Sequence, residues 1–365
     1  MSTLSQLEVT GLRNITKASL PLSPHINLLF GENGSGKTTV LEAIYLLSLG
    51  RSFRTQRSRR LVQDEKESAT VFAKLSCGKT IGIQKTHSGD SITQMDRDRS
   101  VRRGDLAKIL PLQLFDPSTL EMLSGSSEPR RHLLDWGVFH VEHDFLLLWQ
   151  QYRHALLQRN SLLKSAKISS IELDYWEASM ASLAQPLTEH RRVFFEKWKL
   201  FFDQAVHRLL PDEKISMHLS LGWDDATNLA DLLRDSREKD SERGFTQIGP
   251  QRADVRVRVG SLPCEERLSR GQQKLAVCAM KLSVIELLID QYEVRPVLLL
   301  DDIASELDGM ARQRVCDWIA SLGVQVFATA IELNQLSSLW GNVPVHRFHV
   351  EHGDITNVTE AVERA

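Results

Sequence analysis

Nine consecutive residues, GENGSGKTT, have the types and spacing needed to hold a chain of phosphates. Their glycines let the backbone curl closely, so that its N–H groups converge on phosphate oxygens, and the start of a following helix adds partial positive charge. In the pattern G-x-x-x-x-G-K-[ST], the lysine contacts the β- and γ-phosphates and the hydroxyl coordinates Mg²⁺. The residues expected to bind ATP are Gly31, Glu32, Asn33, Gly34, Ser35, Gly36, Lys37, Thr38 and Thr39, with Thr38 also on the metal.

The neighbouring sequence supplies the elements that such a loop needs. The β-type run INLLF, residues 26–30, comes directly before it, and apolar residues at helical spacing follow from Val40 to Leu47. Gly50 then has the position of a glycine that ends a helix. The pattern therefore predicts a strand, the phosphate loop and a helix in that order.

A buried strand that ends in two aspartates supplies the acid that a phosphate loop requires. The run VLLLDD spans residues 297–302. We expect Asp301 to hold Mg²⁺ and the catalytic Asp302 to orient or deprotonate the attacking water, with Lys37 as the second catalytic residue. Taken alone, such a run is also typical of a strand that simply leaves the core. The phosphate loop upstream favours the metal site.

The stretch RLSRGQQKL, residues 267–275, begins a helix in an unusual way. Ser269 and Gln272 form a capping-box pattern, and apolar residues after them indicate one buried face. Gly271 costs a helix roughly 1 kcal/mol, and capping does not require it. A glycine at a capped helix start admits a phosphate closely, although an ordinary capped helix remains the alternative.

The order of these motifs resembles that of the ABC-type ATPases. A phosphate loop, a distant LSxGQ-like signature, the double aspartate and then Ser305-Glu306-Leu307-Asp308 follow one another. In that class the signature faces the γ-phosphate bound by a second subunit. The resemblance implies that Ser269, Gly271 and Gln272 complete the partner's site and that Ser305 and Asp308 form the D-loop.

Two positions depart from the transporter members of that class. Asp302 stands where transporters carry glutamate, and Thr329-Ala330 stands where they place a histidine. We expect slow hydrolysis, with ATP acting as a timed clamp. The segment between the motifs is too short, and too poor in heptads, for the long coiled coils of SMC-type proteins.

Longer words of the sequence resemble the RecF family of bacterial recombination-repair proteins. They are LRNI, GENGSGKTTVLEAIYLLSLGRSFRT, EPRRHLLDWGVFHVE (128–142), GPQRADVR (249–256), LSRGQQKL and LLLDDIASELD. Gln251 stands where that family more often has histidine. The resemblance implies a cytoplasmic, ATP-dependent DNA-binding protein that dimerises around ATP and acts on single-stranded DNA and at junctions beside gaps. It also implies work with RecO and RecR in loading RecA, in SOS induction and in replication restart.

The same resemblance extends to residues outside the main motifs. It places Arg13 near the nucleotide and makes Gln113 a loop glutamine that reports metal occupancy. A basic run between residues 51 and 60 lies just after the phosphate-loop helix, and we expect it to contact DNA, although such runs are also common in solvated loops. Its arginines are Arg51, Arg54, Arg57, Arg59 and Arg60.

The pattern along the chain predicts an α/β fold: an ABC-type P-loop ATPase head, split in sequence, with an inserted mainly helical arm. We expect the head to comprise 1–116 and 245–365 and the arm 117–244. Strands are expected at 7–9, 26–30, 70–75, 80–84, 297–300 and 324–328, and helices at about 270–290 and 310–322.

Composition limits the remaining possibilities. The 365 residues carry a net charge of −2, so DNA binding must come from local patches. No apolar run is long enough to span a bilayer, and the four scattered cysteines indicate neither zinc nor disulfides. Two alternatives remain: an ATPase subunit of a transporter, and an ATP-gated scaffold that does not hydrolyse.

Overall fold

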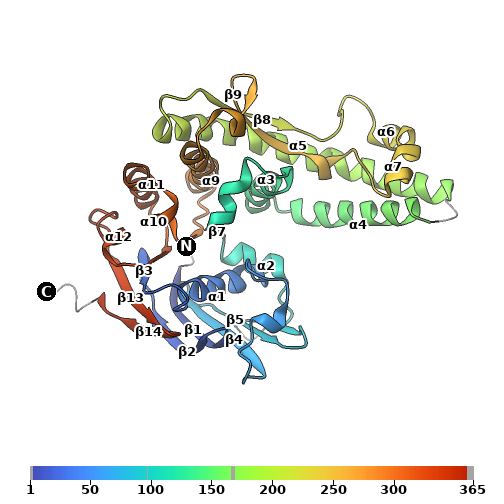
Figure 1. The fold of residues 1–365 in the computed structure, drawn as a ribbon. Helices are drawn as coiled ribbons and strands as arrows, with labels where there is room; N and C mark the ends of the chain where they lie inside the picture. Colours follow the sequence, from blue (N-terminus) through green and yellow to red (C-terminus); the bar gives the residue numbers. More distant parts are fainter. Residues whose placement is uncertain (1–2, 97, 166–168, 360–365) are drawn as a thin grey trace. The chain divides into compact units, whose positions relative to one another are not determined.

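The computed structural model describes residues 3–96, 98–165 and 169–359 (Figure 1). The chain forms two compact units, one made of residues 1–120 and 293–365 and the other of residues 121–292. The first unit is therefore discontinuous in sequence, and the second is inserted into it. Among the described helices, none is long and apolar enough to cross a membrane.

A six-stranded sheet in the first unit has the order β14-β13-β3-β12-β11-β7. All its neighbouring strands are parallel except β13 and β14. The carboxyl ends of the parallel strands therefore meet at one edge of the sheet. The strands are β3 (Ile26–Phe30), β7 (Leu112–Phe115), β11 (Val297–Leu300), β12 (Val326–Ala330), β13 (Val345–Glu351) and β14 (Asp354–Asn357).

A second, antiparallel sheet completes the first unit, with the order β2-β1-β4-β5-β6. The helix α1 (Lys37–Leu49) contacts both sheets, and most of its apolar residues are buried. Residues of both sheets and of α1 share one hydrophobic core. The strands are β1 (Leu4–Leu12), β2 (Ile15–Pro21), β4 (Ser68–Leu75), β5 (Thr80–Thr86) and β6 (Ser91–Met95).

Short helices connect the strands of the first unit. They are α2 (Arg103–Ile109), α10 (Ile303–Glu306), α11 (Gly309–Ser321) and α12 (Asn334–Ser337), with the 3₁₀ segments η1 (Ser58–Arg60) and η2 (Pro117–Met122), the latter ending in the second unit.

The second unit is built on one long helix, α5 (Ser170–Leu209), which at 40 residues is about 60 Å long. It packs against α4 and α9, and a small sheet of order β10-β9-β8 lies in the same unit. The other elements are α3 (Ser127–Val141), α4 (Phe145–Leu163), β8 (Ile215–Ser220), α6 (Leu229–Asp235), α7 (Arg237–Arg243), η3 (Pro250–Arg252), β9 (Asp254–Val259), β10 (Leu262–Pro263), α8 (Cys264–Arg267) and α9 (Arg270–Tyr292).

This division differs from the predicted boundary at residue 244. Residues 245–292, expected in the second half of the head, belong to the same compact unit as the predicted arm. The physical reason is that β9 pairs with β8 and α9 packs along α5. Helix α9 is also buried over more of its surface than the single predicted face.

Two of the sequence words meet inside this unit. Arg130 lies in the motif at 128–142 and Asp254 in the motif at 249–256. The two form a bidentate ion pair with N–O distances of 2.8 and 3.1 Å. Arg191 of α5 joins the two words again, because it pairs with Asp135 and donates to the Pro250 carbonyl at 2.7 Å. Both guanidinium groups are largely buried, so these ion pairs hold the two motifs together within the second unit.

Candidate nucleotide site

The phosphate loop lies where the sequence predicted it, between β3 and α1. The strand has the predicted bounds, and α1 ends at Gly50 in a left-handed conformation whose N–H binds the Leu46 carbonyl at 2.8 Å. The predicted strand, loop and helix are therefore confirmed. Because β3 lies inside the parallel sheet, the loop opens at the edge where the other parallel strands also end.

The loop backbone is held in a conformation that requires glycine. Gly31 has a φ of +149°, and a side-chain Cβ there would stand 2.1 Å from the Val350 carbonyl oxygen. Gly34 has a φ of +79° and faces open space. A substitution at Gly31 would thus collide with the neighbouring strand, whereas one at Gly34 would strain the backbone.

The Lys37 ammonium lies over the loop. It donates hydrogen bonds to the carbonyls of Gly31 at 2.7 Å and of Glu32 at 2.8 Å. Burial lowers the pKa of this amine, and the charges of Asp302 and Asp301 oppose that shift. The lysine and both aspartates of the VLLLDD motif therefore come together at one place.

Asp301 receives hydrogen bonds from two threonine hydroxyls. Thr38 donates to its Oδ1 at 3.1 Å and Thr329 donates to the same oxygen at 2.9 Å. Burial raises the pKa of the Asp301 carboxyl, the two hydroxyls lower it, and the nearby charges of Asp116 and Asp302 raise it further. Several carboxylates close together at a half-buried site favour the binding of a cation.

Asp302 adopts the left-handed conformation with a φ of 54°. Its N–H donates to the Thr329 hydroxyl at 2.9 Å, and its carbonyl accepts from the Ser305 hydroxyl, also at 2.9 Å. Sequence reasoning noted Thr329 only as the replacement for a histidine. The structure shows that its hydroxyl joins both aspartates.

Asn14 is a second residue that sequence reasoning missed. Its side-chain amide donates to the carbonyls of Ser35 at 2.9 Å and Gly34 at 3.3 Å, and its oxygen accepts from the Thr39 hydroxyl at 3.0 Å. It thereby holds the phosphate loop to the start of α1. The signal was present in the word LRNI, from which only the preceding arginine was selected.

The signature segment, in the second unit, has the predicted capping box. Ser269 N–H donates to Gln272 Oε1 at 2.9 Å, and Gln272 N–H donates to Ser269 Oγ at 3.3 Å. Ser269 and Gly271 are exposed, and the space beside the Gly271 α-carbon is open. The cap is therefore confirmed, and the glycine leaves room for a group to approach the helix start.

Comparison with known proteins identifies the family. The family described as RecF/RecN/SMC N terminal domain matches residues 3–355. The DNA replication and repair protein RecF of Stutzerimonas stutzeri is 40% identical over 360 residues, which are 97% of this chain and 97% of that protein. The RecF protein of Pseudomonas paraeruginosa is 38% identical over 361 residues, 98% of each chain. The chain belongs to the RecF family.

Solved structures support the same assignment. The recombination mediator protein RecF of the RecFOR pathway, solved with ATPrS, has a TM-score of 0.85 and 25% identity, with 98% of each chain covered. Its ATP form has a TM-score of 0.84 and 26% identity, with 98% of this chain and 97% of that chain covered. An Smc head from Pyrococcus furiosus, 17% identical with a TM-score of 0.61, shares the fold over 100% of this chain and 98% of its own. The predicted α/β ATPase fold is confirmed, and the transporter alternative is not favoured.

The two residues predicted to form the D-loop take part in local structure. Asp308 caps α11 by accepting from Ala311 N–H at 2.9 Å, and the Ser305 hydroxyl binds the Asp302 carbonyl, as described above. Both residues therefore shape the turn that follows the acids.

Arg13 forms a salt bridge within the first unit. Its guanidinium pairs with the fully buried carboxylate of Glu42 in α1, with Nη2 at 2.8 Å from Oε1. The same carboxylate accepts from the Ser52 hydroxyl, and Arg54 Nη1 lies 3.8 Å from its Oε2. Glu42 thus links Arg13 and the first part of the basic run to the phosphate-loop helix.

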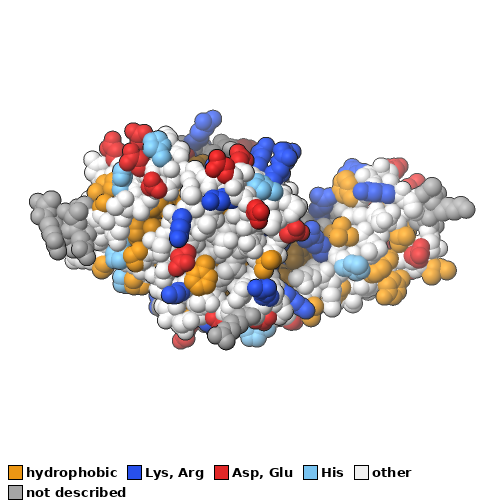
Figure 2. Space-filling view, turned by 90° about the horizontal axis from the view of Figure 1, so that it is seen from below, with side chains coloured by type: hydrophobic (Ala, Val, Ile, Leu, Met, Phe, Trp, Pro, Cys, Tyr) orange, Lys and Arg blue, Asp and Glu red, His pale blue; other side chains and the backbone are white. Residues whose placement is uncertain are grey.

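The basic run itself lies on the surface. All five of its arginines are exposed. An open groove of about 970 Å³ is lined by Arg13, Arg59 and Arg60, together with His87, and also by Asp64 and Glu65. On the face shown in Figure 2, basic and acidic side chains are intermingled, without one continuous basic field. Local DNA contact on this run stays a prediction.

The expectation that Gln113 lies in a loop was wrong. It lies in the middle of β7, buried and paired in register with Leu298 of β11. The physical reason is that LQLF is a short apolar strand added to the edge of the sheet. Asp116 lies just after β7, and its charge, together with that of Asp302, acts on Asp301.

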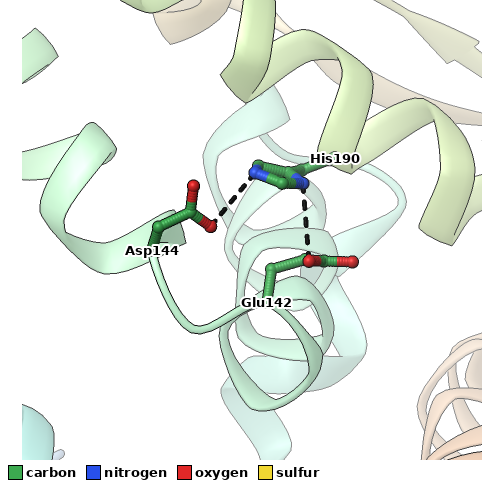
Figure 3. A group of neighbouring side chains, drawn as sticks. All are labelled: Glu142, Asp144 and His190. Carbon is green, nitrogen blue, oxygen red and sulfur yellow. Dashed lines mark ion pairs between the residues drawn. The ribbon is translucent and has the colours of Figure 1, made fainter.

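One group of histidine and carboxylates among the described residues has the composition of a metal site (Figure 3). His190 of α5 lies between Glu142 and Asp144, with Nδ1 at 3.7 Å from the former and Nε2 at 3.2 Å from the latter. Each carboxylate lies beside a different ring nitrogen of His190, so the two carboxylates do not face the same imidazole lone pair. The two ion pairs connect α5 to the turn that joins α3 to α4.

Proposed function

We propose that this chain is an ATP-dependent DNA-binding protein of recombinational repair and replication restart. In this proposal two copies pair around ATP, so that the phosphate loop of each meets the signature of the other. The observation that carries it is the convergence of Lys37, Thr38, Asp301 and Asp302 in a chain that also presents an open signature helix. The RecF relatives and the ATP form of RecF described above support it.

The residues fit MgATP. The loop backbone and Lys37 would hold the phosphates, and Thr38 with Asp301 would hold Mg²⁺. Adjacent ligands of an octahedral Mg²⁺ ion are about 3 Å apart, because each bond is 2.0–2.1 Å long. The separation of 3.1 Å between the Thr38 hydroxyl and Asp301 Oδ1 matches that spacing. Magnesium, when bound, neutralises phosphate charge.

Asp302 would orient or deprotonate the attacking water. Its backbone is held on both sides, by Thr329 and by Ser305, so its carboxylate has a restricted set of positions. Aspartate is one methylene shorter than glutamate, and the following strand brings a threonine in place of a histidine. Both features support slow hydrolysis, so that the bound ATP acts as a clamp that opens after a delay.

We place the DNA contact on the basic run of the first unit. Its five exposed arginines supply phosphate ligands, and Glu42 connects the run to α1 and Arg13. Nucleotide binding at the start of α1 can therefore alter how the run is presented. Single-stranded DNA and its junctions with duplex beside gaps are the proposed substrates, in the cytoplasm, with RecO and RecR as partners that load RecA and support SOS induction.

DNA-binding measurements test this function. Fluorescence anisotropy of labelled gapped DNA should show tighter binding with ATP than without it. Lys37→Met should remove the difference, because its loop cannot hold the phosphates. Ser269→Arg should also remove it while leaving the binding of a fluorescent ATP analogue unchanged. DNA affinity that ignores ATP and both substitutions would exclude the clamp.

A further inference from the structure

The side chain of Gln272 has two partners, and the second belongs to no recognised motif. Its Oε1 accepts from Ser269 N–H at 2.9 Å, within the capping box. Its Nε2 donates to Glu213 Oε1 at 2.8 Å. Glu213 is half-buried and lies in the turn between the end of α5 and β8, where its N–H binds the Leu210 carbonyl at 3.0 Å.

Glu213 fixes which way the Gln272 amide points. An amide offers an oxygen acceptor at one position and an NH₂ donor at the other, and the two have nearly the same shape. A carboxylate can only accept, so the NH₂ group must face Glu213 and the oxygen must face Ser269 N–H. Without Glu213 only the Ser269 N–H still selects the oxygen, and a flipped amide would break this bond because it would place a second donor against that N–H.

The orientation of this amide affects the groups that face a phosphate. The Ser269 N–H donates to Gln272 Oε1, and this bond fixes the serine backbone. The Ser269 Oγ in turn accepts from the Gln272 N–H. The serine hydroxyl hydrogen is then left to donate outward. Gly271, between the two capping residues, is held with its open side exposed.

We propose that Glu213 is a positioning residue for the signature: it orients Gln272, and through it Ser269 and Gly271, toward the ATP bound by a second copy of the chain. The proposal rests on the pairing described under the proposed function. Because Glu213 follows the last turn of the 40-residue helix α5, it also ties the signature to the end of the long helix.

Three variants test the proposal. Glu213→Ala removes the acceptor, Glu213→Gln keeps an oxygen acceptor at the same reach, and Asp212→Ala changes the exposed neighbouring acid as a matched control. ATP-dependent dimerisation, measured by analytical ultracentrifugation, should weaken about ten-fold in Glu213→Ala, as expected for the loss of a hydrogen bond to a charged group. The other two variants should stay near wild type. A fluorescent ATP analogue should bind all of them equally, because the phosphate loop is unchanged.

A mixed dimer makes the test directional. Lys37→Met and Ser269→Arg chains together keep one intact composite site, formed by the phosphate loop of the Ser269→Arg chain and the signature of the Lys37→Met chain. Glu213→Ala should lower the recovered activity about ten-fold when added to the Lys37→Met chain, as expected for the loss of one hydrogen bond to a charged group, and leave it unchanged on the other. If Glu213→Ala does not fold, Glu213→Asp, whose carboxylate is one methylene shorter, takes its place.

The outcomes separate this inference from the function on which it rests. If Ser269→Arg impairs dimerisation and Glu213→Ala does not, the positioning role is refuted and the paired site stands. Equal loss from Glu213→Ala and Glu213→Gln would also refute it, because orientation of the amide needs only an acceptor. If Ser269→Arg itself leaves dimerisation intact, the paired site is refuted.

Discussion

The Thr38 hydroxyl donates a hydrogen bond of 3.1 Å to Asp301, a residue 263 positions away in sequence. The first residue lies at the start of α1 and the second at the end of β11, so the contact forms only when the parallel sheet is complete. The fold thus joins the two motifs that the sequence predicted for one nucleotide site.

Asp301→Asn should stabilise the nucleotide-free protein and abolish its Mg²⁺-dependent ATP binding. Burial and two neighbouring acids raise the pKa of this carboxyl, whereas asparagine keeps the oxygen that accepts from both threonines without the charge. In EDTA at neutral pH, the free energy of unfolding should increase by roughly 1 kcal/mol.

The pH dependence of that difference follows from its sign. A carboxyl with a raised folded pKa stabilises the fold most below its unfolded pKa of about 3.9, and this contribution is lost as pH rises through the folded pKa. The stability gap between Asp301→Asn and wild type should therefore be small near pH 4 and grow toward pH 8. A gap that shrinks with rising pH would contradict the proposed environment of Asp301.

Thr329→Val should reduce ATP hydrolysis about 10–100-fold, as is typical when a partner of a metal-binding carboxylate is lost. Valine has the same shape but removes the hydroxyl that holds Asp301 and accepts the Asp302 N–H. Thr329→Ser keeps the hydroxyl and serves as the matched control. Steady-state phosphate release measures both, and equal activity of the valine and serine variants would show that the hydroxyl has no role.

Asp302→Asn should keep ATP binding and pairing but lower the hydrolysis rate about 100-fold or more, the usual contribution of a general base. The paired state should then persist longer on DNA after free ATP is removed. This substitution also distinguishes the clamp from a scaffold that does not hydrolyse ATP. For a scaffold, wild type and Asp302→Asn would release phosphate at the same negligible rate. Wild-type turnover well above one per second would instead contradict slow hydrolysis.

Replacing Arg57, Arg59 and Arg60 by alanine should weaken DNA binding and flatten its salt dependence. The slope of log affinity against log salt should fall by about 0.7 for each lost contact to single-stranded DNA. Lys79→Ala, an exposed cation in the turn between β4 and β5, is the matched control. Loss of ATP binding with unchanged DNA affinity would assign the run to the nucleotide instead.

The sequence predicted those parts of the site that depend on local residue types. The phosphate loop, its strand and helix, and the capping box at Ser269 and Gln272 each arise from a few neighbouring residues, and the structure confirms their geometry. Their chemical roles remain predictions.

Other parts depend on partners that only the fold brings together. Asn14 contacts a loop about 20 residues away, Thr329 contacts Asp301 across 28 positions, and Glu213 contacts Gln272 across 59. The spacing of residue types along the sequence does not predict contacts between residues so far apart. The division into compact units differs from the boundary predicted at residue 244 for a related reason. The apolar pattern of α9 shows that the helix is buried but not that α5 covers it.

Complementation between two inactive chains tests the central claim, a site shared by two copies. Lys37→Met and Ser269→Arg are each purified, shown to be folded, and assayed for ATP hydrolysis on DNA alone and mixed, with mixed dimers verified by native mass spectrometry. Because one composite site of the mixed dimer is intact, activity should return on mixing although neither chain is active alone. Absence of recovery in verified mixed dimers would contradict a signature that serves the ATP of its partner.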